Sequence, residues 1–204
     1  MRSVGLTIIG DSIIKNNLGK KSYDWSNQLR KNLKNNFNIK FFVKKKIVHG
    51  INSRGVLNLL PDLFYKIDDK FKDILILQVG INDSWHYNSL KGLANVPRKE
   101  FSKNLEEIYN KSKIYDFKKI FFVNYHKIKL NRKDGNNKTP DQNLKSYNDL
   151  ILKFCRKKNI RLINISKISS KSKIKILLND GVHLNLNGVR LYAKIIYKQI
   201  IKYL

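Results

Sequence analysis

Short apolar runs alternate with longer amphipathic segments along the whole of this 204-residue chain. Five runs, at residues 4–9, 39–48, 74–79, 120–124 and 160–163, are rich in Ile, Val and Phe, as buried parallel strands are. Five segments, at residues 24–35, 53–71, 98–115, 141–158 and 187–203, carry apolar residues at helical spacing. Strands that alternate with helices form parallel sheets, so the pattern predicts the α/β class with one doubly wound sheet of five parallel strands.

Nothing in the sequence divides the chain. It has no internal repeat and no linker rich in Pro, Gly or Ser, so we expect a single domain over residues 1–204. Its apolar runs are far shorter than the roughly 18 to 20 residues that a membrane span needs, so no transmembrane segment is expected. The start of the chain lacks a signal-peptide pattern and Cys155 is the only cysteine, so we expect a cytoplasmic protein without an intrachain disulfide. The polar segment at residues 125–138 predicts an exposed loop.

The formal net charge of +27 is the most unusual property of the composition. It is compatible with a nucleic-acid partner, with an anionic surface, or with a lysine-rich composition alone. The lysines are spread over every segment, and no zinc-finger, helix-turn-helix or RNA-recognition signature accompanies them. We therefore favour a compositional origin, with no specific nucleic-acid partner and only weak, salt-sensitive association with polyanions.

Gly10-Asp11-Ser12 follows the first predicted strand directly. In doubly wound sheets, functional side chains collect at the carboxyl ends of the strands, which is where this serine would lie. If a helix began here, its free N–H groups and positive dipole end would favour a developing oxyanion. The alternative is an ordinary helix cap, in which Asp11 or Ser12 satisfies free amides.

A second polar motif, Gly80-Ile81-Asn82-Asp83, follows the third predicted strand. The side-chain amide of Asn82 can donate to a charge that develops near Ser12. The same residue types favour turns, and the motif is compatible with both roles.

Asp180-Gly181-Val182-His183 precedes the last predicted helix. A serine hydroxyl is weakly nucleophilic until a base removes its proton, and a histidine base works best when a carboxylate fixes its tautomer. Asp180 and His183 are three residues apart and can face one pocket from a single turn. A lone histidine before a helix is more often a surface or capping residue, but the three motifs together favour a catalytic site.

The ordered series Gly-Asp-Ser, a glycine motif, Gly-x-Asn-Asp and Asp-x-x-His resembles blocks I, II, III and V of the SGNH (GDSL-type) hydrolase family. The resemblance covers nearly the whole chain and implies the three-layer α/β/α, flavodoxin-like fold of that family. It also implies that Ser12 is the nucleophile, His183 its base, Asp180 the carboxylate that orients the base, and Asn82 an oxyanion donor.

Two glycines, Gly50 and Gly55, are candidates for the glycine of the family's block II. We choose Gly50, because the segment that begins there, followed by the leucines of the next helix, matches the family's pattern without a gap. Ile51 and Asn52 replace the Asp-Thr pair that many members have. By resemblance, the oxyanion hole then consists of the backbone N–H groups of Ser12 and Gly50 and the side chain of Asn82.

For substrate binding we choose Asp11, Trp85 and Tyr125, because the two aromatic residues lie at predicted strand ends where an acyl or alcohol pocket would open; loop packing is the alternative for them. The histidines outside the Asp-x-x-His motif are in separate loops without metal-ligand spacing, so we expect no metal and no cofactor.

The implied reaction is the cleavage of a small-molecule carboxylic ester or thioester through an acyl-serine intermediate. Short-chain esters, thioesters, lysophospholipids and O-acetylated sugars all remain candidate substrates, since a fold and a set of catalytic residues identify only the reaction class. Two other functions stay open: an acyltransferase, and a non-catalytic protein of the same fold that docks on anionic surfaces.

Overall fold

A computed structural model describes residues 3–15, 21–36, 39–86 and 92–204 of the chain. Its sheet has five parallel strands in the order β2-β1-β3-β4-β5. The strands are β1 (Ser3–Gly10), β2 (Lys40–Ile47), β3 (Ile74–Gln78), β4 (Lys119–Val123) and β5 (Arg161–Ile163). Each of them lies within two residues of a predicted strand, so the predicted doubly wound sheet is confirmed.

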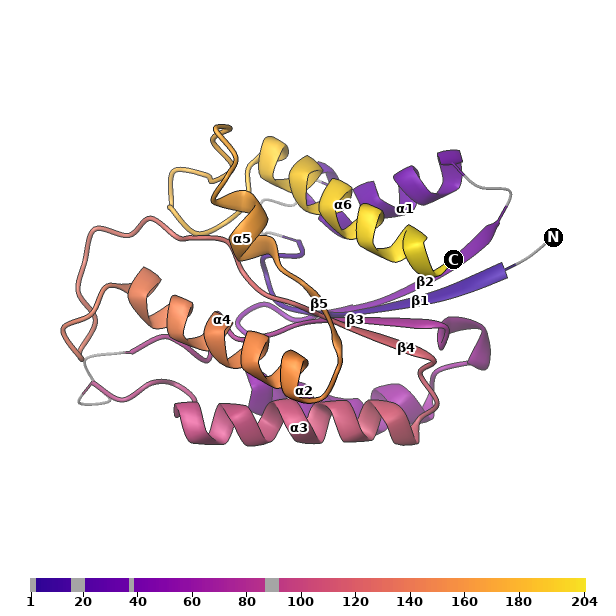
Figure 1. Cartoon of the computed structure of the whole chain (residues 1–204), viewed down its shortest axis with the longest axis horizontal. Coiled ribbons are helices and arrows are strands. Elements are labelled where there is room, and N and C mark those ends of the chain that lie inside the picture. The colour runs from indigo at the N-terminus through magenta and orange to yellow at the C-terminus, as the bar shows by residue number, and fades with distance from the viewer. Residues whose placement is uncertain (1–2, 16–20, 37–38, 87–91) are drawn as a thin grey trace.

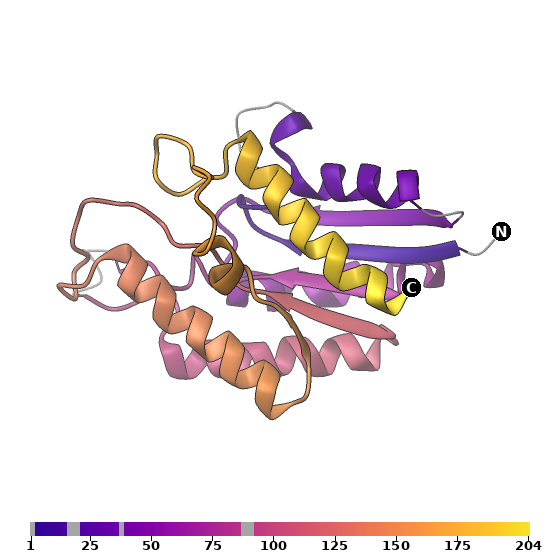
Figure 2. The same ribbon diagram turned by 45° about the horizontal axis from the view of Figure 1, so that its top comes forward.

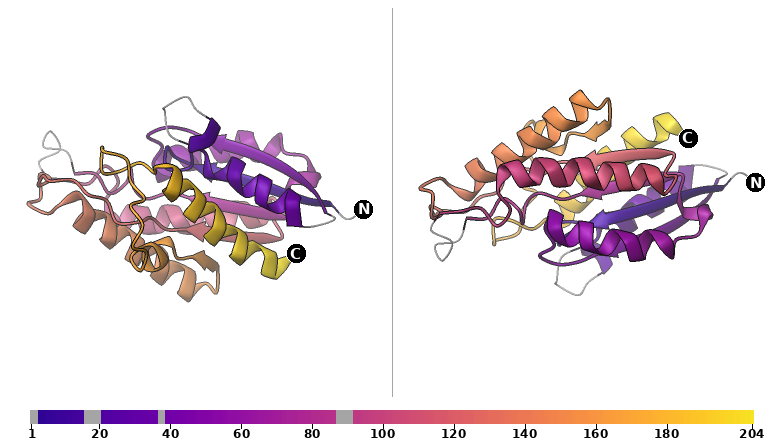
Figure 3. Two further views of the ribbon diagram at one scale, coloured as in Figure 1. Left: turned by 90° about the horizontal axis from the view of Figure 1, so that it is seen from above. Right: turned by 90° about the horizontal axis from the view of Figure 1, so that it is seen from below.

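Helices cover both faces of the sheet and complete three layers (Figures 1 and 2). One face carries α1 (Trp25–Asn36), α5 (Ile165–Ser169) and α6 (Leu186–Ile200), and the other carries α2 (Ser53–Tyr65), α3 (Arg98–Ile114) and α4 (Pro140–Lys157). Figure 3 shows α1 and α6 side by side over one face and the second set of helices over the other.

Two helix boundaries differ from the prediction, and one helix was missed. The predicted helix at residues 53–71 ends at Tyr65, although Ile67 beyond it is still buried. The last helix ends at Ile200 and continues only as a 3₁₀ turn at Ile201–Tyr203. The short helix α5 was not predicted; it begins where the Asn164 side chain accepts a hydrogen bond from the Lys167 backbone N–H. A five-residue helix is too short to show a hydrophobic period.

Each central strand packs against both helical layers. In β3, Ile74 and Ile76 belong to the core under α1 and α6, whereas Leu75 and Leu77 belong to the core over α2, α3 and α4. Successive side chains of a strand point to opposite faces, so a continuous apolar run is what a strand buried on both sides requires.

The edge strand β2 is less buried than its apolar run predicts, because it pairs only with β1. Its lysines Lys44, Lys45 and Lys46 keep part of their surface in solvent. Charged side chains of this kind protect an open strand edge against pairing with another chain.

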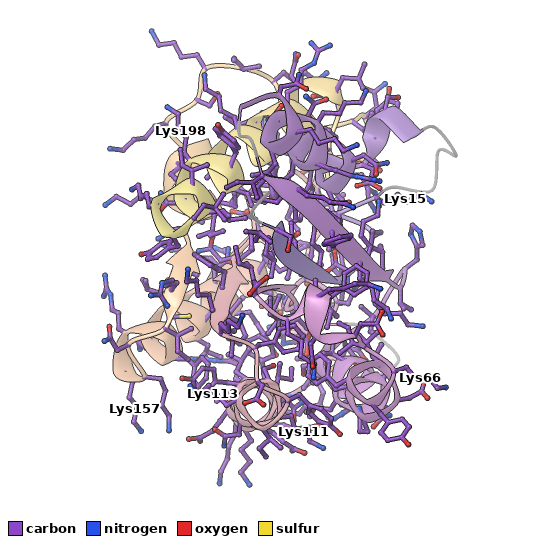
Figure 4. The ribbon with its side chains drawn as sticks, turned by 90° about the vertical axis from the view of Figure 1, so that its right-hand side faces the viewer. Lys15, Lys66, Lys111, Lys113, Lys157 and Lys198 are labelled. Carbon is purple, nitrogen blue, oxygen red and sulfur yellow. The ribbon has the colours of Figure 1, made fainter. Side chains whose placement is uncertain are left out.

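Lysine side chains project from the molecule in many directions, as Lys15, Lys111 and Lys198 show in Figure 4. Within the described ranges, no helix is long and apolar enough to cross a membrane.

The strand order places the turning point of the topology at β1. The chain leaves β1 for β2 on one side of it and returns to β3 on the other. Gly10, the last residue of β1, pairs with Ile47 in β2 and with Gln78 in β3, so the three strands end at one level. In open α/β sheets, ligands bind outside the carboxyl ends of the strands at such a point.

Candidate active site

Ser12 lies in a tight turn directly after β1. The Ile14 N–H donates to the Asp11 carbonyl at 3.1 Å, and the Ile13 N–H donates to the Asp11 carboxylate at 2.9 Å. These bonds close the turn and leave the Ser12 side chain partly exposed at its apex. Residues 12–14 form a turn that the Asp11 side chain stabilises, so Ser12 lies in a turn and not at a helix start, and α1 begins at Trp25, one residue from the predicted start of the first helix.

Asp180 and His183 lie on a loop whose two ends are joined like a hairpin. Leu177 and Leu184 form an antiparallel bridge, and the Leu178 N–H donates to the His183 carbonyl at 2.8 Å. Within the loop Gly181 has a φ of +71°, and a Cβ there would lie 1.9 Å from the Lys129 carbonyl oxygen. Only glycine fits both the conformation and the close approach, so the loop packs directly against the segment that follows β4.

The side chains of Asp180, His183 and Ser12 form one continuous hydrogen-bonded chain. Nδ1 of His183 lies 2.7 Å from Oδ2 of Asp180, and Nε2 of His183 lies 3.0 Å from Oγ of Ser12. A carboxylate can only accept, so Nδ1 carries the proton and the Nε2 lone pair faces the serine hydroxyl. This is the arrangement in which a histidine can remove the serine proton.

Asp180 is held ionised by its own loop. Partial burial by itself would raise its pKa, but the backbone N–H groups of Val182 and His183 donate to Oδ1 at 2.9 Å each, and His183 donates to Oδ2. Together these bonds hold the pKa of Asp180 below its usual value. The carboxylate is therefore charged at neutral pH and can stabilise an imidazolium on His183.

The loops after β2 and β3 lie next to each other at the same edge of the sheet. The Asn82 side-chain amide donates to the Ile51 carbonyl at 2.9 Å, which ties the β3 loop to the residue after Gly50. The Val48 N–H donates to the Gly10 carbonyl at 3.0 Å, which ties the β2 loop to the serine turn. Gly50 itself is exposed and has a φ of +73°, a left-handed conformation that glycine adopts readily. The three predicted oxyanion donors thus come from three joined loops.

Asp83 is a supporting residue for which the sequence analysis predicts only a turn. It is fully buried, and its Oδ1 accepts the Ser53 N–H at 2.9 Å at the start of α2. Burial is the main cause that raises its pKa to about 6. Asp83 therefore fixes the start of α2 relative to Asn82, its neighbour in sequence.

Asp11 and Tyr125 lie behind the serine turn. Both are 0% exposed, and the Tyr125 hydroxyl donates to Asp11 Oδ2 at 2.5 Å. The Asn148 side chain in turn accepts from the Tyr125 N–H and donates to its carbonyl. Neither side chain presents any surface, and both support the turn that carries Ser12, so a direct contact of Asp11 or Tyr125 with substrate stays a prediction.

The segment at residues 125–138 is also more buried than predicted. Tyr125, His126, Ile128 and Asp134 are all at most 5% exposed. The segment follows β4 at the carboxyl edge of the sheet, where the catalytic loops pack on it, so its first residues belong to the core. Within the part of the chain that the structure describes, no group of three or more His, Cys, Asp or Glu residues is arranged to hold a metal ion.

Comparisons with known proteins place the chain in a family. The family described as GDSL-like Lipase/Acylhydrolase matches residues 6–196, which is nearly the whole chain. The chain belongs to this family. A comparison with curated protein sequences finds no match.

Solved structures of similar fold include several esterases. The crystal structure of TesA has 17% sequence identity and a TM-score of 0.74, and the alignment covers 100% of both chains. Axe2, an acetylxylan esterase from Geobacillus stearothermophilus, has 18% identity and a TM-score of 0.76 over 98% of this chain and 96% of that one. The acetyl xylan esterase AlAXEase has 20% identity and a TM-score of 0.71 over 96% and 100%. At these identities the likeness shows that this GDSL-type chain shares their fold.

Trp85 lies in the loop after β3, three residues after Asn82. It is partly buried, its carbonyl accepts the Asn95 N–H at 2.7 Å, and the Arg132 guanidinium lies over its ring at 5.2 Å from the centroid. The indole therefore joins the β3 loop to the long loop after β4, and it keeps part of its surface exposed.

Proposed function

We propose that this GDSL-type hydrolase is a serine esterase that cleaves a carboxylic ester or thioester through an acyl-Ser12 intermediate. The observation that carries the proposal is the hydrogen-bonded chain from Asp180 through His183 to Ser12, with atoms 2.7 and 3.0 Å apart. These residues come from opposite ends of the sequence, and packing alone gives no reason to align a carboxylate, an imidazole and a hydroxyl in this order.

In the first step Ser12 Oγ attacks the carbonyl carbon of the ester while its proton moves to Nε2 of His183. The tetrahedral intermediate collapses, its bond to the leaving oxygen or sulfur breaks, and the His183 proton goes to that atom. Water then attacks the acyl-enzyme carbonyl while His183 takes one of its protons; the bond to Ser12 Oγ breaks, the proton on His183 returns to that oxygen, and the acid is released. Asp180 stabilises the imidazolium in both steps.

The oxyanion would be held by N–H groups that do not already donate to an acceptor within the protein. Among the described residues, the backbone N–H groups of Ser12 and Gly50 have no acceptor in the protein. The Asn82 amide uses one of its two hydrogens on the Ile51 carbonyl, which leaves the second for the substrate. Removal of one such donor typically lowers kcat by about 10²- to 10³-fold.

The decisive test is the hydrolysis of p-nitrophenyl acetate together with labelling by a fluorophosphonate probe. Ser12→Ala should abolish labelling and lower kcat by about 10³-fold or more, because it removes the hydroxyl that is hydrogen-bonded to His183 Nε2. Ser22→Ala, an exposed serine in the same part of the chain, should keep the parent rate. Parent-level hydrolysis by Ser12→Ala would refute the proposal.

The ester itself is open among short-chain esters, thioesters, lysophospholipids and O-acetylated sugars. Comparison of kcat/KM over a series of acyl chain lengths in each class identifies it, and we propose that Trp85 contacts the substrate. Product analysis with added acceptor alcohols separates hydrolysis from acyl transfer, since a transferase would form a new ester in place of the free acid.

We also propose weak association with polyanions, which a groove beside α1 favours. The groove encloses about 900 Å³, and among the described residues that line it six are basic: Lys15, Arg30, Lys31, Lys34, Lys45 and Arg190. Its one acidic residue, Asp24, is buried and already pairs with Lys45 at 2.8 Å. Within the described residues the other five basic side chains have no ion pair, so the concave surface carries uncompensated positive charge.

Retention on a heparin column tests this association. The double variant Lys31→Glu/Lys34→Glu should elute at lower salt than Lys113→Glu/Lys157→Glu, which makes the same change in net charge on α3 and α4, away from the groove. Equal elution of the two variants would mean that the net charge alone is responsible.

A further inference from the structure

His126 is a buried histidine that the proposed reaction does not use. It follows β4 after two residues, is 0% exposed, and lies behind the loop that carries Asp180 and His183. Its Nε2 lies 2.8 Å from the Val182 carbonyl oxygen, and its Nδ1 lies 2.5 Å from the Tyr192 hydroxyl. Both ring nitrogens are therefore engaged, one by the catalytic loop and one by α6.

The partners determine which nitrogen carries the proton. A carbonyl oxygen only accepts, so Nε2–H of His126 donates to Val182, and Nδ1 accepts from the Tyr192 hydroxyl. That hydroxyl also accepts the His126 backbone N–H at 3.3 Å. Burial is the main cause that lowers the pKa of His126 to about 4, with a smaller contribution from His183, while the hydrogen bond to Val182 and the charge of Asp180 oppose it; the ring is therefore neutral at physiological pH.

The Val182 carbonyl and the His183 N–H belong to the same peptide unit. At one end of this unit the carbonyl accepts from His126, and at the other end the N–H donates to Asp180 Oδ1 at 2.9 Å. One peptide earlier, the Gly181 carbonyl accepts the Lys129 N–H at 2.7 Å. A planar unit held at both ends cannot rotate, and its orientation sets the direction in which the His183 side chain leaves the backbone.

We propose that His126, with its tautomer fixed by Tyr192, is a positioning residue that holds the Val182–His183 peptide and so keeps the His183 imidazole within reach of Ser12. The inference rests on the proposed esterase function. Since reacting groups must be held in a narrow geometry, a displacement of about 1 Å at His183 is enough to lower the rate on the order of 10²-fold.

The kinetic test compares three variants with the parent enzyme on p-nitrophenyl acetate. His126→Phe fills the space without a donor and should lower kcat about 10- to 100-fold with KM within about twofold. His126→Gln can donate its side-chain amide to Val182 and should recover most of the lost kcat. Tyr192→Phe removes only the tautomer-fixing hydroxyl and should lower kcat less than His126→Phe does.

Ser112→Ala is the matched control for loss of a buried hydrogen bond. The Ser112 side chain is 0% exposed and donates to the Ile108 carbonyl at 2.7 Å in α3, far from the site in sequence and fold. It should lower the melting temperature with no change in kcat. If His126→Phe behaves in the same way, or if His126→Gln is as slow as His126→Phe, the positioning role is refuted.

A spectroscopic measurement separates this inference from the esterase proposal. In ¹⁵N-histidine-labelled protein, the hydrogen-bonded Nδ1 proton of His183 should be seen in the parent and in His126→Gln and be lost or shifted in His126→Phe and Tyr192→Phe. A parent that is neither hydrolytic nor labelled by fluorophosphonate refutes the esterase proposal, whereas an unchanged His183 signal in all variants refutes the positioning role.

Discussion

The position of Asp11 in the Gly-Asp-Ser motif indicates a contact residue, but the structure gives it a buried, supporting role. It stands beside the proposed nucleophile, but its carboxyl group is completely buried and receives the Tyr125 hydroxyl and the Ile13 N–H. Burial is the largest cause that raises its pKa to about 7, and the two hydrogen bonds oppose it. A carboxyl group that titrates near neutral pH inside a protein makes stability depend on pH.

We expect the stability contribution of Asp11 to be fully present below about pH 4 and to be lost as the pH rises through 7, because the folded protein binds the Asp11 proton more tightly than the unfolded chain does. Between pH 5 and pH 8.5 the free energy of unfolding of the parent should therefore fall by a few kcal/mol relative to that of Asp11→Asn. Urea denaturation over this range measures it. Asp149→Asn, at an exposed position, should give a curve parallel to the parent, and a parallel curve for Asp11→Asn would contradict the prediction.

At the scale of elements, the residue that caps α6 also connects this helix to a neighbouring segment. Asn185 caps it by accepting the Gly188 N–H at 2.9 Å, and its side-chain amide also donates to the carbonyls of Lys175 and Leu177, at 2.9 and 3.1 Å. The same residue therefore joins α6 to the strand-like segment that enters the catalytic loop. The Asn185 side chain therefore supports both the start of α6 and the loop that positions His183.

Asn185→Ala should lower the free energy of unfolding by about 2 kcal/mol or more, since it removes a cap and leaves two carbonyls without their donor. Asn52→Ala at the start of α2 removes a cap with a single bond to the Gly55 N–H and should cost about half as much. Urea unfolding of both variants makes the comparison. Equal losses would show that the two extra bonds of Asn185 contribute nothing.

At the scale of the whole molecule, the parallel sheet brings together what the sequence keeps apart. Ser12 follows β1, Asn82 follows β3 and His126 follows β4, and parallel strands bring all three to one edge. The lysines are arranged differently: they project from elements on many sides, as Figure 4 shows, so the +27 charge belongs to the whole surface, with a local excess in the groove beside α1.

The sequence by itself determined the α/β class with a parallel sheet, because apolar runs alternate with amphipathic segments along the whole chain. The flavodoxin-like arrangement followed from the resemblance to the GDSL-type family, which rests on the motifs that contain Ser12, Asn82 and the Asp180–His183 pair. The sequence did not determine which polar residues are buried. Asp11 and Tyr125 looked like contact residues and are internal, whereas His126 looked like a loop residue and holds the catalytic loop.

Only the tertiary structure decided those roles. Whether a side chain faces solvent or a neighbouring loop depends on segments far away in sequence: Tyr125 meets Asp11, and His126 meets Val182 and Tyr192. Hydrophobic periodicity reports which face of an element is buried, but it carries no information about which loop packs on the end of a strand. The residues that we propose as catalytic could be predicted from local motifs, while the residues that we propose to hold them in place depend on contacts that form only when the sheet is assembled.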